Sequence, residues 1–325
     1  MADCYTRLIN TNNNKPSCLI VTATAKEYAE ELERITETAI PYKACTSADE
    51  ALEKYEDETI LFGRPDMLAE VLPQLPAVKW VQSSWAGVTP LIAGKRRDYV
   101  LTGVKDVFGP QMSEYVIGYL LAHELRILER TEKQKRHEWF KGFSRTLHGK
   151  RLGIMGTGSI GRYIATKAIL LDMQVIGLSR SGKPVTPFQK VMPATQLHDF
   201  LADLDYLVAI LPDTPDTETL LDAKAFEALP DHAYLINIGR SNVIDDAALI
   251  DALENKKLSG ATLDVFDEEP VPEDSALWDA RNLNITAHIA AVSLPSLIVP
   301  IFVDNYRRYV NDQPLHYVID FETGY

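Results

Sequence analysis

Short apolar runs alternate with amphipathic stretches along the first third of the chain. The runs are rich in β-branched residues and predict strands at 18–23, 59–62, 78–82 and 99–102. Between them, apolar residues recur at helical spacing near 27–35, 67–72 and 88–92. Because strands that alternate with helices form parallel sheets covered by helices, this pattern predicts an α/β domain.

A single long helix is predicted after these strands. It runs from Pro110 to about Phe140, and the proline stands near its first turn, where a backbone N–H has no helical partner in any case. One side of the predicted helix carries Met112, Tyr115, Val116, Tyr119, Leu120 and His123. A helix of this length is typical of a connection between two domains.

A second alternating series begins after Gly149. Its apolar runs predict strands at 151–156, 174–179, 204–211, 233–239, 258–266 and 284–287. Six strands with intervening helices fit a complete doubly wound nucleotide-binding domain. A last helical stretch at 295–311 has no strand of its own to cover, so we expect it to fold back on the first domain. A chain of 325 residues is long enough for two domains.

The net charge limits the classes of partner that such a protein can bind. The chain has 33 Lys and Arg against 46 Asp and Glu, a formal charge of −13. This balance argues against a nucleic acid or an anionic membrane held by a broad basic surface, so bound anions must be held by local groups. The most apolar long stretch, 285–303, is too polar to span a bilayer. The N-terminal residues do not resemble a secretion signal, and we expect a cytoplasmic protein.

Neither metal chemistry nor acyl transfer is indicated. Cys4, Cys18 and Cys45 lack metal-ligand spacing, and we interpret them as reduced thiols. No serine lies in a Gly-x-Ser-x-Gly elbow. Six of the seven histidines have no paired acid motif and are interpreted as structural or surface residues, namely His123, His137, His148, His198, His232 and His316.

The strongest local signal is a glycine-rich turn between a predicted strand and a predicted helix. In this setting Gly-x-Gly-x-x-Gly is typical of dinucleotide binding. Gly156 permits the tight turn, Gly158 lets the backbone approach a pyrophosphate, and Gly161 lets the helix pack on the strand. Glycines also occur in purely structural turns, but the strand-to-helix context favours the dinucleotide. The turn residues expected at the cofactor are Gly156, Thr157, Gly158, Ser159, Ile160 and Gly161.

The end of the next predicted strand indicates which dinucleotide is bound. In NAD-binding domains an Asp or Glu about 20 residues beyond the glycines binds the ribose. This chain has no acid there. It has two cations and two hydroxyls suited to a 2′-phosphate, supplied by Ser179, Arg180, Ser181 and Lys183. A solvated basic turn is the alternative interpretation. We expect NADPH to be preferred and NADH to be possible.

Three further polar residues follow predicted strands at their carboxyl ends, where α/β sheets bind ligands. These are Arg240, Glu269 and His288. Each alone has an ordinary interpretation, as a solvated arginine, a charged loop and a packed histidine. Their shared position instead favours a joint site, with a cation for a substrate anion, an imidazole that donates a proton, and a carboxylate that orients it.

Together these motifs resemble the D-isomer-specific 2-hydroxyacid dehydrogenase family, and within it the glyoxylate/hydroxypyruvate reductase branch. The resemblance covers most of the chain from about Thr59. It rests on ordered motifs, which are Gly156-Thr-Gly-Ser-Ile-Gly161, Leu211-Pro-Asp-Thr214 with Thr217, Asn237-Ile-Gly-Arg240, Leu263-Asp-Val-Phe266 with Glu269-Pro270, and His288-Ile-Ala290. One departure is Ser241, where many relatives have glycine.

The resemblance implies a fold of two doubly wound parallel-sheet α/β domains. A Rossmann nucleotide-binding domain at 105–291 would be inserted into a flavodoxin-like substrate domain formed by 1–104 and 292–325. The active site would lie in the cleft between the two domains. A homodimer is also expected, formed through the long helix after Pro110.

The resemblance also implies residue roles. Arg240 would hold the substrate carboxylate and carbonyl oxygen, His288 would protonate that oxygen, and Glu269 would hold the imidazole. The substrate carboxylate would also meet backbone amides of the loop at Trp85, Ala86 and Gly87. Asp264 would contact the nicotinamide carboxamide. Further implied cofactor contacts are Leu211, Pro212, Thr217, Ile238, Gly239, His288 and Ala290.

The implied activity is an NADPH-preferring reductase of small 2-oxo acids, such as glyoxylate or hydroxypyruvate, that forms the D-2-hydroxy acid. An NAD-linked D-2-hydroxyacid dehydrogenase is the enzymatic alternative. A non-catalytic protein that senses dinucleotides on the same fold is the alternative from another class. The presence of Arg240, Glu269 and His288 argues against that last interpretation.

Overall fold

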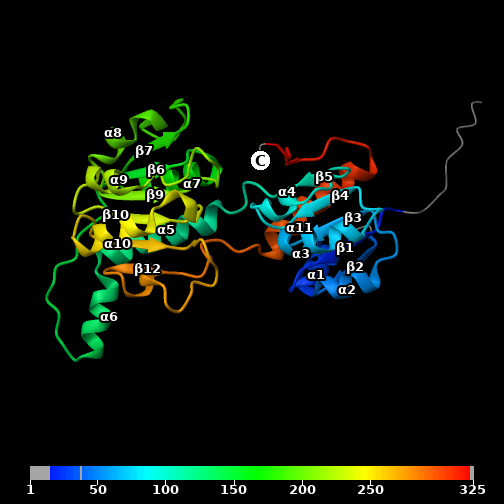
Figure 1. The fold of residues 1–325 in the computed structure, drawn as a ribbon, viewed down its shortest axis with the longest axis horizontal. Coiled ribbons are helices and arrows are strands. Elements are labelled where there is room, and N and C mark those ends of the chain that lie inside the picture. Colours follow the sequence, from blue (N-terminus) through cyan, green and yellow to red (C-terminus); the bar gives the residue numbers. More distant parts are fainter. Residues whose placement is uncertain (1–14, 37–38, 323–325) are drawn as a thin grey trace, which may run out of the picture. The chain divides into compact units, whose positions relative to one another are not determined.

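The structure is a computed structural model that describes residues 15–36 and 39–322, so Cys4 lies outside the described residues. The chain divides into two compact units. One unit contains the described residues up to Val107 together with those from Ser293 onward, and the other is Phe108–Val292. Each unit is built on a parallel sheet packed against helices (Figure 1). None of the helices in the described ranges is both long and apolar enough to cross a membrane.

In its described residues, the first unit has a five-stranded parallel sheet in the order β2-β1-β3-β4-β5. The strands are β1 (Cys18–Val21), β2 (Tyr42–Cys45), β3 (Ile60–Gly63), β4 (Trp80–Ser83) and β5 (Val100–Thr102). The helices are α1 (Ala25–Ile35), α2 (Ala48–Lys54), α3 (Pro65–Val71), α4 (Thr89–Ala93) and α11 (Pro295–Val310). This strand order is that of flavodoxin-like doubly wound domains.

The last helix packs on the sheet of the first unit, as predicted. Helix α11 contacts α1, and its Phe302 ring stacks on Phe62 of β3 with centroids 4.4 Å apart and on Trp80 of β4 at 5.3 Å. All three aromatic side chains are fully buried. Burial of such large apolar surfaces is the main stabilising contribution to a core. The C-terminal helix is therefore part of the first unit although 185 residues of the second unit separate the two chain segments.

The second unit has a seven-stranded parallel sheet across its described residues, in the order β12-β11-β10-β9-β6-β7-β8. Its strands are β6 (Arg151–Met155), β7 (Gln174–Ser179), β8 (Lys190–Pro193), β9 (Tyr206–Ala209), β10 (Tyr234–Asn237), β11 (Gly260–Leu263) and β12 (Leu283–Ile285). Its helices are α5 (Gly109–Glu124), α6 (Ile127–Lys135), α7 (Ser159–Ile169), α8 (Leu197–Leu201), α9 (Ala223–Ala228) and α10 (Asp246–Glu254). The order is that of a Rossmann domain with one additional strand at the β12 edge. Short 3₁₀ turns occur at Leu72–Gln74, Ala194–Gln196, Ser241–Val243 and Ala276–Asp279.

The prediction of one helix from Pro110 to about Phe140 is wrong. Helix α5 ends at Glu124, and α6 begins at Ile127 after Arg126, whose φ of 54° is left-handed. The reason is a contact from further along the chain, because the backbone N–H of Arg145 donates to the carbonyl oxygen of Glu124 at 2.9 Å. The side chain of Arg145 also donates to the buried Glu124 carboxylate at 3.0 Å. These bonds hold the end of α5, and α6 leaves in a new direction without burying any residue.

Candidate active site

The candidate residues of the second unit lie at the carboxyl edge of its sheet. The glycine-rich turn follows β6, and Ser179 ends β7. Leu211, Pro212 and Thr217 follow β9, and Ile238, Gly239 and Arg240 follow β10. Asp264 and Glu269 follow β11, and His288 and Ala290 follow β12. Because parallel strands point the same way, their following loops gather at one edge, which is where doubly wound domains bind ligands.

The glycine-rich turn needs its first and last glycines for the packing of the chain itself. Gly156 has a φ of 112°, and a Cβ there would lie 2.7 Å from the carbonyl oxygen of Ile210. A Cβ on Gly161 would lie 2.0 Å from the carbonyl oxygen of Gly156. A Cβ on Gly158 would meet no protein atom within 4 Å. The backbone at Gly158 is thus open to a ligand, beside the N-terminus of α7 at Ser159, Ile160 and Gly161.

A tight turn after β7 presents two cations to solvent. Gly182, with a φ of 66°, donates its N–H to the hydroxyl of Ser179 at 3.1 Å. The N–H of Lys183 donates to the hydroxyl of Ser181 at 3.4 Å. Arg180 and Lys183 are exposed, and no acid in the described part of the chain pairs with either. The turn therefore offers two uncompensated positive charges at the end of the strand that follows the glycine motif.

The loops after β9 and β10 approach each other closely. A Cβ on Gly239 would lie 2.8 Å from the backbone nitrogen of Leu211. The loop after β9 is held by Thr217, whose hydroxyl donates to the carbonyl oxygen of Pro212 at 2.7 Å and accepts the N–H of Thr214 at 3.0 Å. These contacts give the loop a fixed backbone beside the residues that precede Arg240.

Arg240 is held by its own turn. The side chain of Asn237 donates to the carbonyl oxygen of Arg240 at 3.0 Å, and its amide oxygen accepts the N–H of Gly239 at 3.1 Å. Burial lowers the pKa of Arg240, while the nearby carboxylates of Asp213 and Glu269 raise it. Because a guanidinium keeps its proton far above neutral pH, Arg240 stays positively charged. Ser241 begins a 3₁₀ turn and has no left-handed φ, so the backbone at this position does not require a glycine.

His288 and Glu269 form a direct pair. Nδ1 of His288 lies 2.9 Å from one carboxylate oxygen of Glu269 and 3.2 Å from the other. The carboxylate is itself oriented by the backbone N–H of Phe266, which donates to it at 3.0 Å. Since an ionised carboxylate only accepts, Nδ1 of His288 carries a proton and Nε2 is left for another partner. Both side chains are partly exposed, so a ligand can reach this imidazole.

Asp264, which is predicted to contact the cofactor, is buried, with 1% of its surface exposed. Its carboxylate accepts hydrogen bonds from the hydroxyl of Thr286 and from the backbone N–H groups of Ile289 and Ala290. The sequence contained no signal for these bonds, because the donors follow a different strand. Oδ2 accepts only one of these bonds, so one of its acceptor positions is not used by them.

The candidate substrate loop follows β4 in the first unit. The hydroxyl of Ser83 accepts the N–H of Trp85 at 3.1 Å and donates to its carbonyl oxygen at 2.9 Å. Trp85 and Ala86 are exposed and Gly87 is half-buried. The guanidinium of Arg64 lies 4.8 Å from the centroid of the Trp85 ring, a cation–π contact that sequence analysis did not anticipate. The loop is thus braced from its own unit while its backbone stays accessible.

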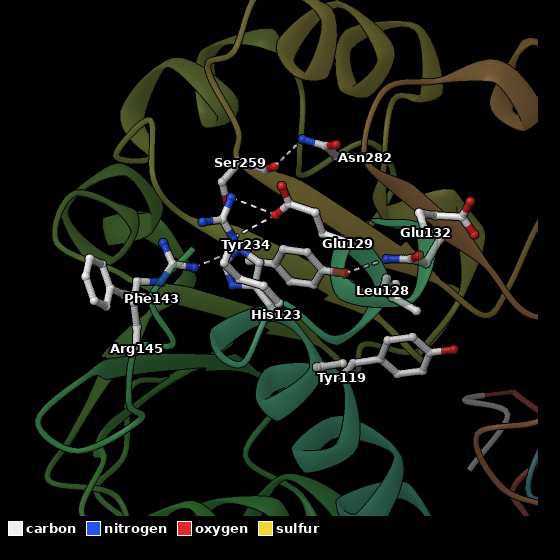
Figure 2. A pocket seen from close by; sticks show the side chains of 13 residues that line it. Tyr119, His123, Leu128, Glu129, Glu132, Phe143, Arg145, Tyr234, Ser259 and Asn282 are labelled. Atoms are coloured by element: carbon white, nitrogen blue, oxygen red, sulfur yellow. Dashed lines mark hydrogen bonds and ion pairs between the residues drawn. The ribbon is translucent and has the colours of Figure 1, made fainter. Parts of the chain in front are cut away.

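A separate cavity of about 580 Å³ lies at the opposite, amino edge of the second sheet. Figure 2 shows His123, Glu129, Arg145 and Tyr234 among the side chains that line it. Burial, reinforced by the charge of Arg145, lowers the pKa of His123 to about 4, so this imidazole is neutral at physiological pH. No candidate catalytic or cofactor residue lines this cavity.

Some of the remaining histidines have acid partners that the sequence did not indicate. His148 contacts Asp172 at 3.3 Å, His232 contacts Asp205 at 3.3 Å, and His316 contacts Asp304 at 3.4 Å. The partner acids lie far along the chain in the first two pairs, so no local motif could reveal them. These histidine side chains are exposed, and exposed pairs contribute little to stability.

Comparisons with known proteins agree on one family. A family model described as D-isomer specific 2-hydroxyacid dehydrogenase, NAD binding domain, matches residues 117–290. Glyoxylate/hydroxypyruvate reductase A of Serratia proteamaculans (strain 568) is 34% identical over 215 residues, which cover 66% of this chain and 69% of the relative.

Solved structures of the same family resemble the whole fold. A D-isomer specific 2-hydroxyacid dehydrogenase family protein from Aeromonas salmonicida has a TM-score of 0.90 at 37% identity and covers 95% of this chain and 100% of its own. An NADPH-dependent glyoxylate/hydroxypyruvate reductase from Sinorhizobium meliloti, solved with NADP and sulfate, has a TM-score of 0.81 at 28% identity and covers 95% and 100%.

Proposed function

The chain belongs to the D-isomer-specific 2-hydroxyacid dehydrogenase family of NAD(P)-dependent oxidoreductases, and we propose that it is an NADPH-preferring reductase of small 2-oxo acids such as glyoxylate and hydroxypyruvate. The product would be the D-2-hydroxy acid. The observation that carries this proposal is the pair of His288 and Glu269 at the sheet edge that also holds Arg240 and the glycine-rich turn. The names of the Serratia and Sinorhizobium relatives support the substrate class.

The second unit fits a dinucleotide in three places. The pyrophosphate would lie over Gly158, where the backbone is open, and at the N-terminus of α7. The 2′-phosphate of NADPH would be held by Arg180 and Lys183, which have no acidic partner among the described residues. The carboxamide would reach the remaining acceptor position of Asp264. When bound, the dinucleotide supplies a hydride from nicotinamide C4.

The residues of this chain would bind and protonate the substrate. Arg240 attracts the ketoacid carboxylate and its carbonyl oxygen, and its guanidinium fork fixes their orientation. In its doubly protonated form, His288 donates the Nε2 proton to the carbonyl oxygen as negative charge develops there, and it keeps the proton on Nδ1. Glu269 holds Nδ1 and so fixes the ring and its tautomer. The amides at Trp85, Ala86 and Gly87 in the first unit are proposed as a second carboxylate contact.

Cofactor preference tests the proposal at Arg180. The wild-type chain should oxidise NADPH with glyoxylate or hydroxypyruvate at a higher kcat/KM than NADH. Arg180→Ala removes a charge-assisted contact to the 2′-phosphate, so the KM for NADPH should rise by about tenfold or more, while that for NADH stays within about twofold. Both constants can be measured by following the absorbance of the reduced cofactor.

Arg281→Ala is the matched control for this experiment. Arg281 is another exposed arginine of the second unit but precedes β12 and so lies at the amino edge of the sheet. It should leave both KM values unchanged. Equal kcat/KM for NADPH and NADH in the wild-type chain would contradict the preference for NADPH and favour the NAD-linked alternative.

A homodimer and a cytoplasmic location complete the proposal. Helix α6 and the segment after it extend away from the second sheet in Figure 1, and α6 buries no residue. Trp139 and Phe143 in that segment are each 89% exposed, which suggests that a second copy covers them. Light scattering should give twice the mass of the chain, and a monomer at micromolar concentration would contradict the dimer.

The proposed cytoplasmic location is supported by the cysteines. Cys18 and Cys45 are buried free thiols, as a reducing compartment allows.

A further inference from the structure

The loop that carries His288 has an unusual backbone. His288 has a φ of 54°, in the left-handed region that residues other than glycine rarely adopt. Such a conformation persists only where the surrounding contacts hold it. The contacts on either side of His288 therefore determine where its imidazole points.

Asp264 holds the two peptide groups that follow His288. One oxygen of its carboxylate accepts the N–H of Ile289 and the other accepts the N–H of Ala290, both at 2.8 Å. Asp264 directly follows β11, and its side chain is buried. A single buried carboxylate thus fixes the backbone just beyond the left-handed residue.

Two hydroxyls connect this carboxylate to helix α5. The hydroxyl of Thr286 lies 2.5 Å from Asp264, and that of Tyr115 lies 2.6 Å from Thr286. Because a carboxylate only accepts, Thr286 donates its one hydroxyl proton to Asp264, and Tyr115 must then donate to Thr286. Burial raises the pKa of Tyr115, which keeps this donor protonated. The chain of hydrogen bonds therefore runs in one direction, from Tyr115 to Thr286 to Asp264.

Helix α5 also holds the far end of the loop. The side-chain amide of Gln111 donates to the carbonyl oxygen of Val292 at 3.0 Å and accepts the N–H of the same residue at 3.0 Å. Gln111 and Tyr115 are four residues apart on a helix, so they lie on the same face. One face of α5 therefore contacts the loop both before and after His288.

We propose that α5 positions His288, with Tyr115 acting through Thr286 and Asp264 on one side and Gln111 acting through Val292 on the other. This inference rests on the proposed function, in which His288 is the proton donor. Tyr115, Thr286 and Gln111 are positioning residues that touch neither substrate nor cofactor in this proposal. Their loss should misplace the imidazole and lower kcat, with little effect on the binding of ketoacid or NADPH.

The test uses substitutions that remove a single hydroxyl. Thr286→Val and Tyr115→Phe should each lower kcat about ten- to a hundredfold and leave both KM values within about twofold. Thr286→Ser keeps the hydroxyl and should restore wild-type kcat. Tyr234→Phe is the matched control, because it removes a buried tyrosine hydroxyl that contacts a threonine, Thr262 at 2.7 Å, at the opposite edge of the sheet. It should leave kcat unchanged.

A double-mutant cycle separates positioning from general damage to the fold. In a His288→Ala background there is no imidazole to misplace, so adding Thr286→Val should not lower the residual rate further. An equal loss in both backgrounds would overturn the inference, as would wild-type kcat in Thr286→Val and Tyr115→Phe. Melting temperatures identify a variant that does not fold, and Tyr115→Phe then carries the test. If His288→Ala alone left kcat unchanged, the proposed proton donor itself would be wrong.

Discussion

Alanine in place of His288 should lower kcat for ketoacid reduction by roughly 10²–10⁴, the usual contribution of a general acid. The reason is geometric, because Glu269 holds Nδ1 and leaves Nε2 as the nitrogen from which a proton can pass to the substrate. Steady-state kinetics with NADPH and hydroxypyruvate would measure the loss. The affinity for NADPH should change little, since the glycine-rich turn and Arg180 are untouched.

Two further variants make this result specific. His288→Asn tolerates the left-handed backbone better than alanine does, so it tests loss of the imidazole with less disturbance of the loop. His198→Ala removes an exposed histidine from α8 in the same unit and should leave kcat unchanged. Activity within about tenfold of wild type in both His288 variants would remove this residue from the role of proton donor.

Removal of the Arg240 side chain should have the second large effect. In Arg240→Ala, kcat/KM for the ketoacid should fall by about 10²-fold or more, because truncation of one partner of a desolvated charge pair costs about 2–5 kcal/mol. Arg240 is partly buried among carboxylates, and its burial lowers its pKa, so the substrate carboxylate would meet a poorly hydrated and strongly attracting cation. Kinetics with varied ketoacid at saturating NADPH would measure the fall.

Arg240→Lys tests whether a positive charge alone is enough to bind the substrate. It keeps the charge but not the planar fork that binds two oxygens at once, so it should recover only part of the lost kcat/KM. The dissociation constant for NADPH, measured by fluorescence titration, should stay within about twofold of wild type in both variants. Unchanged kcat/KM in Arg240→Ala would show that another group anchors the substrate.

The apolar pattern predicted central strands well because both of their faces are buried. Strands β1, β3 and β4 are buried along their whole length and lie within a few residues of their predicted ranges. Strand β7, which is partly buried, occupies its predicted range of 174–179. Strands β2 and β8 were not predicted from the sequence. Both lie at an edge of their sheet, where a strand is only partly covered and needs no continuous apolar run. Incomplete burial weakens the apolar pattern of an edge strand without always removing it, since the edge strands β5 and β12 were predicted.

Features that depend on distant contacts could not be read from the local sequence. Helix α5 ends where Arg145, some twenty residues further along, bonds to Glu124. The hydrogen bonds that Asp264 accepts could not be read for the same reason, because the donors Ile289 and Ala290 follow another strand. By contrast, the glycine-rich turn is a local motif whose backbone requirements at Gly156 follow directly from its spacing.

The fate of the hydride tests the central claim most directly. NADPH that carries deuterium at nicotinamide C4 would be incubated with the wild-type chain and hydroxypyruvate, and the product analysed by mass spectrometry and chiral chromatography. The proposed function predicts the D-2-hydroxy acid with deuterium on C2. Absence of turnover, an L-configured product, or a product without deuterium on C2 from NADPH labelled on either face would contradict it.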